Sequence, residues 1–297
     1  MAEGVSAGGD LRAYEIADVF TDVPLQGNAV AVFTDGRGLS DRQMQRAARE
    51  LNLSETVFVL GGAIGGGNGD AADGAVPIRI FTPAVELPFA GHPILGTAFV
   101  LGSKSGARVV RLQTQAGVVP VKLTRAGDEV VLGEMQQPIP TWEPFGAADE
   151  LLAALGVARS GLPVEAYTNG PTHVYVALGS DAEVAAVRPE LTALAALGPI
   201  GVSCFASHGE VVKTRMFGPA IGVAEDPATG SAAGPLALHL ARHGLTPFGA
   251  QLEIHQGAEI GRPSLLRARV EGSAEHVKRV LVGGSAVVVA RGEYRLG

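Results

Sequence analysis

The chain has 297 residues, of which 46% are hydrophobic and 18% are charged, and its formal net charge is −7. This composition excludes a disordered or collagen-like chain, and the acidic balance without a basic cluster disfavours nucleic acid binding. No apolar run reaches the roughly 18 residues of a membrane span. At roughly 150 residues per domain, the length favours two domains.

The N-terminal segment and the cysteine content indicate where the protein works. Residues 1–11 are small, acidic and glycine-rich, without the basic and apolar regions of a signal peptide, so we expect a disordered tail. Cys204 is the only cysteine and cannot form an internal disulfide, which fits a reducing compartment. The sequence therefore predicts a cytoplasmic protein.

Short strand-like runs, often β-branched and bounded by turn residues, follow one another along the chain. In the first half they cover 12–20, 28–33, 56–60, 77–81, 108–113 and 117–123. In the second half they cover 172–178, 210–217, 251–255, 264–270 and 285–290. Capping-box spacings at Ser40 and Ser180 predict helices near 41–51 and 181–187. The glycine-rich stretch 61–74 predicts a flexible loop.

Two segments of the chain resemble each other. Arg-Ile-Phe-Thr-Pro-Ala at 79–84 matches Arg-Met-Phe-Gly-Pro-Ala at 215–220, and Pro-Phe-Ala-Gly-His at 88–92 matches Pro-Ala-Thr-Gly-Ser at 227–231. Chance similarity of two Gly/Pro turns is the alternative explanation. The matching order of strand, turn and apolar helix instead favours two similar domains. We expect them to cover 12–136 and 137–284, with the last strand, 285–297, joining the first.

The helices expected after these turns, near 93–101 and 232–240, are apolar on nearly every face. Such a helix must be surrounded by protein, which in a strand-rich domain means a central helix wrapped by a curved sheet. Pro93 is expected at the first helical position of one helix, and Ser231 is expected to cap the other, which Gly244 ends. The unpaired N–H groups of both N-termini would together form an anion site between the domains.

Four polar residues near these turns are candidates for the chemistry. Glu55 begins an apolar strand, where partial burial would raise its pKa toward the range useful for proton transfer. His92 and Ser231 occupy equivalent positions of the repeat, and Asp226 lies just before the second turn. Glu55 could instead be a solvated strand end, and His92 a buried structural histidine. Ser231 could simply cap a helix, and Asp226 could simply cap a turn, without a role in the chemistry. The matched placement favours a functional role.

These segments also carry a specific family resemblance. Glu-Asp-Pro-Ala-Thr-Gly-Ser-Ala-Ala-Gly-Pro at 225–235 and Glu-Leu-Pro-Phe-Ala-Gly-His-Pro at 86–93 resemble the signature pair of the PhzF isomerase family of phenazine biosynthesis. Supporting pieces are Asp-Val-Phe-Thr at 18–21, Gly-Asn at 27–28, Asn-Leu-Ser-Glu-Thr at 52–56, Gln-Gly at 256–257 and Gly-Arg-Pro-Ser at 261–264. The resemblance covers about residues 12–291, essentially the whole chain.

The resemblance implies the diaminopimelate epimerase-like α/β (α+β) fold: two pseudosymmetric domains, each a strongly curved sheet wrapped around a central apolar helix. It implies a homodimeric, cofactor-independent isomerase that transfers a proton on a small cyclic carboxylate, such as trans-2,3-dihydro-3-hydroxyanthranilate. By motif, Glu55 corresponds to the catalytic acid/base. The groups that assist the transfer and bind the substrate and its carboxylate would be His92, Asp226, Ser231, and the backbone around Gly91 and Gly230.

Other chemistries fit the sequence less well. Cysteine-based racemisation is disfavoured because the two turns carry Ala90 and Thr229 where related racemases use thiols. His239 and His243 have a metal-like spacing, but no third ligand is apparent in the sequence and no nucleotide-binding motif is present, so we expect no metal and no cofactor. Two alternatives stay open: an isomerase or epimerase acting on another small acid, and a binding protein that kept the fold without the chemistry.

Overall fold

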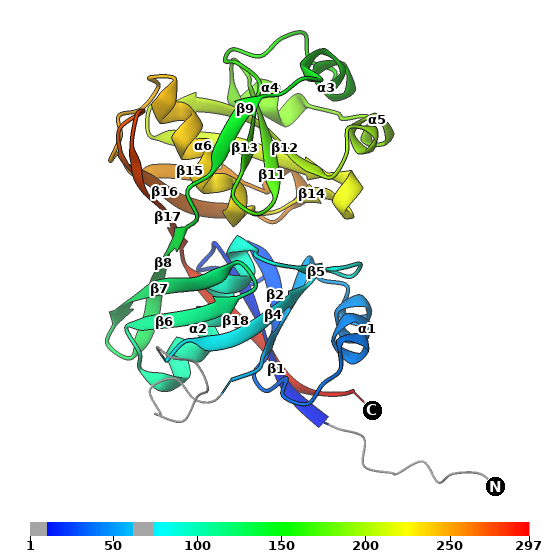
Figure 1. The fold of residues 1–297 in the computed structure, drawn as a ribbon, viewed down its shortest axis with the longest axis vertical. Helices are drawn as coiled ribbons and strands as arrows, with labels where there is room; N and C mark the ends of the chain where they lie inside the picture. The colour runs from blue at the N-terminus through cyan, green and yellow to red at the C-terminus, as the bar shows by residue number, and fades with distance from the viewer. Residues whose placement is uncertain (1–10, 62–73, 297) are drawn as a thin grey trace, which may run out of the picture.

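A computed structural model of the protein describes residues 11–61 and 74–296. The chain forms two lobes, one above the other in Figure 1, each with a central helix surrounded by strands. Most of the predicted loop 61–74 and the first ten residues of the predicted tail lie outside the described residues, while Leu11 already belongs to the first strand. No helix of the described part of the chain is long and apolar enough to cross a membrane.

The lower lobe of Figure 1 contains the first part of the chain and the last strand. Its strand β1 pairs antiparallel with β2 and with β18, while β2 runs parallel to β3. Its elements are β1 (Leu11–Val19), β2 (Asn28–Phe33), α1 (Asp41–Leu51), β3 (Glu55–Val59), β4 (Val76–Phe81), β5 (Glu86–Leu87), α2 (Gly91–Ser105), β6 (Val109–Thr114), β7 (Gly117–Ala126), β8 (Glu129–Gln137) and β18 (Ala286–Arg295).

The upper lobe is built around α6. Its strands β11 and β12 are parallel, and β12, β13 and β14 continue as antiparallel pairs. Its main elements are β9 (Thr141–Pro144), α3 (Ala148–Leu155), β10 (Glu165–Thr168), β11 (Thr172–Ala177), α4 (Asp181–Ala186), α5 (Leu191–Ala196), β12 (Ile200–His208), β13 (Val211–Gly218), β14 (Val223–Asp226), α6 (Gly230–Arg242), β15 (Leu252–Gln256), β16 (Ser264–Gly272) and β17 (Val277–Gly284).

The two lobes are connected through a strand pair. Strand β17 of the upper lobe pairs antiparallel with β8 of the lower lobe, with Val280 opposite Gln137. Strand β18 then returns to β1. The proposed division at residue 137 stays a prediction, although the pairing of β18 with β1 is the contact expected of a last strand that joins the first domain.

The two apolar helices are buried, as their lack of a polar face predicts. Every residue of α6 from Gly230 to Ala241 is buried, and so are the first ten residues of α2. The expected start positions are wrong by two residues. Ala90 and Thr229 are the N-caps, so Pro93 is the third residue of its helix and Ser231 the second, and Ser231 caps nothing. Gly244, with φ of 73°, follows the end of α6 as predicted.

The repeat is visible in matched ion pairs. Arg79 forms two hydrogen bonds to Glu86, of 2.7 and 2.6 Å, and its guanidinium lies 5.0 Å from the ring centre of Phe81. Arg215 forms two bonds of 2.8 Å to Glu225 and lies 4.9 Å from the Phe217 ring, in the equivalent arrangement. A bidentate pair of this kind fixes the strand that leads to each central helix. The two domains are therefore pseudosymmetric, as the repeat predicts.

Candidate active site

The N-termini of α2 and α6 meet at two glycines. A Cβ atom on Gly91 would lie 2.7 Å from the carbonyl carbon of Gly230 and 2.7 Å from the backbone nitrogen of Ser231. A Cβ on Gly230 would in turn lie 3.2 Å from the backbone of Gly91. A side chain at Gly91 would clash with the backbone of α6 and one at Gly230 would be tightly packed, so the two glycines let the positive ends of two helix dipoles come together.

Glu55 and His92 form a buried pair beside this contact. Glu55 is the first residue of β3 and His92 the second of α2, and Glu55 Oε2 lies 3.2 Å from His92 Nε2. Both atoms are buried, yet neither forms a well-directed hydrogen bond within the described part of the protein. The 3.2 Å approach is therefore a close contact of two buried polar atoms whose hydrogen-bonding capacity is not used by other described residues.

Burial sets the protonation of this pair. Desolvation, assisted by the nearby charge of Asp226, raises the pKa of Glu55 well above its usual range. Desolvation also lowers the pKa of His92 to about 3, so the imidazole is neutral at pH 7. A carboxyl group that holds its proton more readily than a solvated glutamate then lies next to a neutral imidazole, which suits proton transfer in either direction.

Asp226 is joined to His92 through Asn28. The Asn28 side-chain amide donates to Asp226 Oδ1 at 2.9 Å and to the carbonyl of Ala228 at 3.0 Å, and it lies 3.3 Å from His92 Nδ1. The Thr229 hydroxyl donates to Asp226 Oδ2 at 2.6 Å. Burial raises the pKa of Asp226 to about 6, against the opposing effect of these hydrogen bonds. The network spans both lobes, since Asn28 and His92 belong to one and Asp226 to the other.

Ser231 follows Gly230 in α6, and its hydroxyl has its own partner. Its hydroxyl is 3.0 Å from His173 Nε2, and Asn169 donates to its carbonyl at 3.0 Å. Gln137 donates to the carbonyl of Gly230 at 2.8 Å. Burial lowers the pKa of His173 to about 4, so its ring is neutral at pH 7 and can either accept from or donate to the hydroxyl.

The structure brings together all six residues singled out in the sequence. Asn28, Thr229 and His173 complete the cluster without having been assigned a role there. Asn28 and Thr229 lie inside the quoted motifs, so the motifs gave a signal for both. His173 lies on β11, 58 positions before Ser231, and no local pattern marks it.

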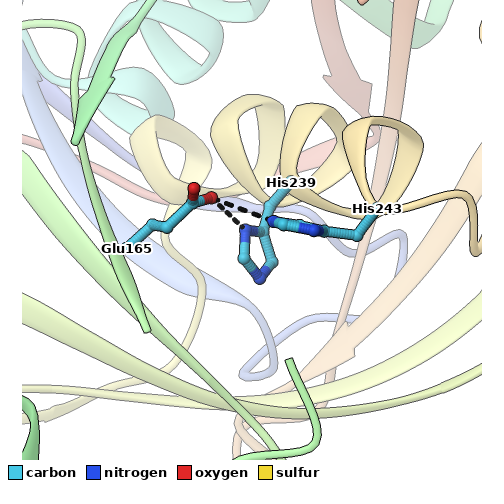
Figure 2. Close-up of side chains that lie close together, drawn as sticks. All are labelled: Glu165, His239 and His243. Atoms are coloured by element: carbon cyan, nitrogen blue, oxygen red, sulfur yellow. Dashed lines mark hydrogen bonds and ion pairs between the residues drawn. The ribbon is translucent and has the colours of Figure 1, made fainter. Parts of the chain in front are cut away.

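A second polar cluster lies at the far end of α6. Within the described residues, Glu165, His239 and His243 form a group whose nitrogen and oxygen atoms are spaced as metal ligands would be (Figure 2). Glu165 supplies the third possible ligand atom, which the sequence did not reveal because this residue lies on β10, 74 residues before His239. This cluster differs from the site at the N-termini of α2 and α6, where the side chains offer groups for proton transfer and hydrogen bonding.

The chain matches the family described as phenazine biosynthesis-like protein, PhzC-PhzF, over residues 17–292. It is 52% identical to trans-2,3-dihydro-3-hydroxyanthranilate isomerase of Pseudomonas aeruginosa, a match that covers 95% of this chain and 99% of that protein. The chain is also similar to the crystal structure of a PhzF-family protein from Bacillus anthracis, with a TM-score of 0.81 and 24% identity. This match covers 96% of this chain and 99% of that protein.

A further solved structure supports the epimerase-like fold. A protein described as a predicted epimerase, from Pseudomonas aeruginosa, has a TM-score of 0.80 at 32% identity, with 95% of this chain and 99% of that one covered. The family match extends over the strands, the two central helices and the site between them. The chain belongs to the PhzF family of phenazine biosynthesis-like proteins and is an isomerase.

Proposed function

We propose that the protein isomerises trans-2,3-dihydro-3-hydroxyanthranilate, or a closely related small cyclic carboxylate, by moving one proton between two ring carbons without a cofactor. The name of the relative from Pseudomonas aeruginosa supports this substrate class. The observation that carries the proposal is the buried Glu55 carboxyl, whose Oε2 lies 3.2 Å from His92 and has no well-directed hydrogen bond among the described residues.

In this reaction Glu55 acts as both base and acid. The carboxylate takes a proton from ring carbon C3, and the electron pair of that C–H bond shifts into the conjugated ring. The protonated Glu55 then returns the proton to C1, and the resulting enol relaxes to a ketone. The raised pKa of Glu55 favours this cycle, because a group that must both accept and return a proton works best when its pKa is near the operating pH.

The other polar groups bind and orient the substrate. The N–H groups that follow Gly91 and Gly230 would receive the substrate carboxylate, since helix N-termini attract anions. Asp226 and His92, held together by Asn28, would contact the polar substituents of the ring. Ser231 would donate to the carboxylate, and the Nε2–H of His173 would donate to the serine oxygen. Two converging dipole ends also stabilise negative charge that develops on the ring during transfer.

We further propose that the protein works as a homodimer in the cytoplasm. The family resemblance supports the dimer, and the single, buried thiol of Cys204 supports a reducing compartment. Light scattering coupled to size-exclusion chromatography tests the dimer directly. A mass equal to one chain at micromolar concentration would refute it.

Glu55→Gln is the decisive test of the mechanism. The amide is nearly isosteric but is a poor base, and a positioned acid/base contributes about 10²- to 10⁴-fold to a rate, so turnover should fall by at least about 100-fold. Glu50→Gln, on the exposed face of α1, is the matched control and should leave turnover unchanged. Turnover is followed by NMR in deuterated water with dihydroanthranilate-like acids as substrates.

Each outcome of this test has a clear meaning. Loss of turnover with substrate affinity kept within about tenfold supports Glu55 as the acid/base. Near-normal turnover of Glu55→Gln refutes the assignment and transfers the role to His92 or Asp226. If the wild-type protein turns over a different small acid in the panel and leaves the dihydroanthranilate unchanged, the substrate is wrong while the proton-transfer chemistry stands.

A further inference from the structure

The end of α6 remote from the active site carries a compact group of ligating atoms. Glu165 Oε2 lies 3.2 Å from His239 Nδ1 and 3.0 Å from His243 Nε2, and Figure 2 shows the three side chains converging from β10 and α6. His239 and His243 are four residues apart, so they face the same side of the helix. His239 lies about 14 Å along the helix axis from Gly230, well separated from the helix contact.

This set of atoms has the chemistry of a transition-metal site. Two imidazole nitrogens and one carboxylate oxygen are the protein ligands of many open zinc sites. Around a tetrahedral zinc ion with bonds of about 2.0–2.1 Å, neighbouring ligand atoms lie about 3.3 Å apart. The two nitrogen–oxygen distances, 3.2 and 3.0 Å, are close to that value, and all three ligand atoms lie within 4.8 Å of one another. We propose that Glu165, His239 and His243 bind a divalent transition metal such as Zn²⁺.

The surroundings of the cluster act both for and against metal binding. The Tyr167 hydroxyl donates to Glu165 at 2.8 Å and lies 3.1 Å from His239 Nδ1, so it can orient the carboxylate or face the ion's fourth position. His239 Nε2 is buried and has no hydrogen-bond partner among the described residues. Metal binding at Nδ1 places the ring proton on Nε2, so the Nδ1 contact with Glu165 is exchanged for a bond to the metal and the buried Nε2–H has no acceptor among the described residues.

Arg242 is the competitor for the same carboxylate. Its Nη1 donates to Glu165 Oε2 at 2.7 Å, and its guanidinium lies 4.3 Å from the ring centre of Trp142. The guanidinium supplies the positive charge that balances Glu165 when no metal is bound. Metal binding must weaken this ion pair, because both cations use the same oxygen. Removal of the Arg242 charge should therefore strengthen metal binding, which distinguishes a metal site from a purely structural network.

The experiment titrates the full chain, freed of metal with a chelator, with Zn²⁺ by calorimetry and by fluorescence. Trp142 is the only tryptophan in the sequence, so its emission reports directly on the Arg242 contact. We expect one ion per chain, with a change in Trp142 emission and a rise in Tm. Substitution of Co²⁺ should give the visible absorption of a nitrogen- and oxygen-ligated ion.

Four variants decide the result. His243→Gln, at a partly exposed position, should weaken Zn²⁺ binding by at least about tenfold, and Arg242→Gln should strengthen it by a similar factor, the scale on which shell substitutions act at metal sites. The controls are His208→Gln on the surface and His92→Asn in the active site, and both should bind as wild type does. His92→Asn separates this site from the proposed catalytic one.

Several outcomes would overturn the proposal. The proposal is wrong if neither the wild type nor Arg242→Gln binds Zn²⁺ at about 100 µM, which corresponds to a free energy of binding weaker than about −5.5 kcal/mol. Wild-type affinity in His243→Gln, or loss of binding in His92→Asn, would also overturn it. Weaker binding in Arg242→Gln would show that the arginine supports the cluster rather than competes with the ion. Circular dichroism of every variant establishes that it is folded.

Discussion

The glycine contact between the two central helices makes Gly91→Ala an informative substitution. The new methyl carbon would lie 2.7 Å from both the carbonyl carbon of Gly230 and the nitrogen of Ser231. Non-bonded carbon atoms normally lie about 3.5–4.0 Å apart, so the two helix ends must separate by about 1 Å. The atoms in the way belong to the backbone of a buried helix, so no side chain can rotate to make room.

The expected effect on the reaction is larger than the effect on stability. Overpacking of this kind destabilises a protein by about 1–3 kcal/mol. A displacement of about 1 Å in an active site can reduce the rate about 100-fold, because the reacting groups lose their alignment. We therefore expect Gly91→Ala to remain folded and to lose about two orders of magnitude in turnover.

A matched control separates these two effects. Gly96→Ala lies in the same helix, and its methyl group would meet the side chains of Val30 at 2.6 Å and Val19 at 2.8 Å. It should lower the urea midpoint comparably, because it also overpacks the core, yet it leaves the helix ends in place. Turnover and urea unfolding are measured for both variants. If Gly91→Ala keeps turnover within a factor of three of Gly96→Ala, the helix contact does not position the reacting groups.

Further predictions concern pH and the connection between the lobes. Burial lowers the pKa of His173 to about 4, so the free energy of unfolding decreases as the pH drops from about 6.5 toward 4. In urea unfolding, His173→Asn should remove up to about 3 kcal/mol of this decrease. Burial raises the pKa of Asp226 from 3.8 to about 6, so the free energy of unfolding decreases as the pH rises through this range. Asp226→Asn should remove this decrease. An unchanged dependence of the free energy of unfolding on pH would contradict the burial argument. Arg262 of the upper lobe contacts the lower lobe, where it donates to the buried Asp18 at 2.7 Å and to the carbonyl of Gly27. Arg262→Gln should therefore lower the free energy of unfolding by about 1–3 kcal/mol. Arg37→Gln, in an exposed ion pair, should not change it measurably.

The sequence predicted best those elements whose pattern reflects local physics. The capping box at Ser40 and Gln43 is present, and α1 covers 41–51 as predicted. The strands expected from β-branched runs agree with the structure within a few residues. Seven strands of the described part of the chain were not predicted: β5, β8, β9, β10, β12, β14 and β17. Strand β12 is buried along most of its length and so lacks the alternation that marks a half-buried strand. The short helices α3 and α5 were also missed.

The candidate site divides in the same way. Glu55, His92, Asp226 and Ser231 lie in motifs or at repeat positions, so the sequence could indicate each of them. What brings them together is the contact of Gly91 with Gly230 and the Asn28 bridge to Asp226, which join residues 139 and 198 positions apart. The third member of the metal-like cluster, Glu165, has no sequence relationship to His239, because pairing of distant strands and helices places it there. Tertiary contacts of this range leave no periodic signal.

The return of strand β18 to β1 also bears on how the protein is synthesised. Leu11 pairs with Arg295, so the first strand obtains this neighbour only when the residues up to 295 have left the ribosome. Until then one edge of β1 offers unpaired N–H and C=O groups to other chains, a known route to aggregation. Closing contacts of such long sequence separation also makes folding slow. Nascent chains arrested before residue 286 should therefore depend on chaperones, while release of the last ten residues of β18 completes the sheet.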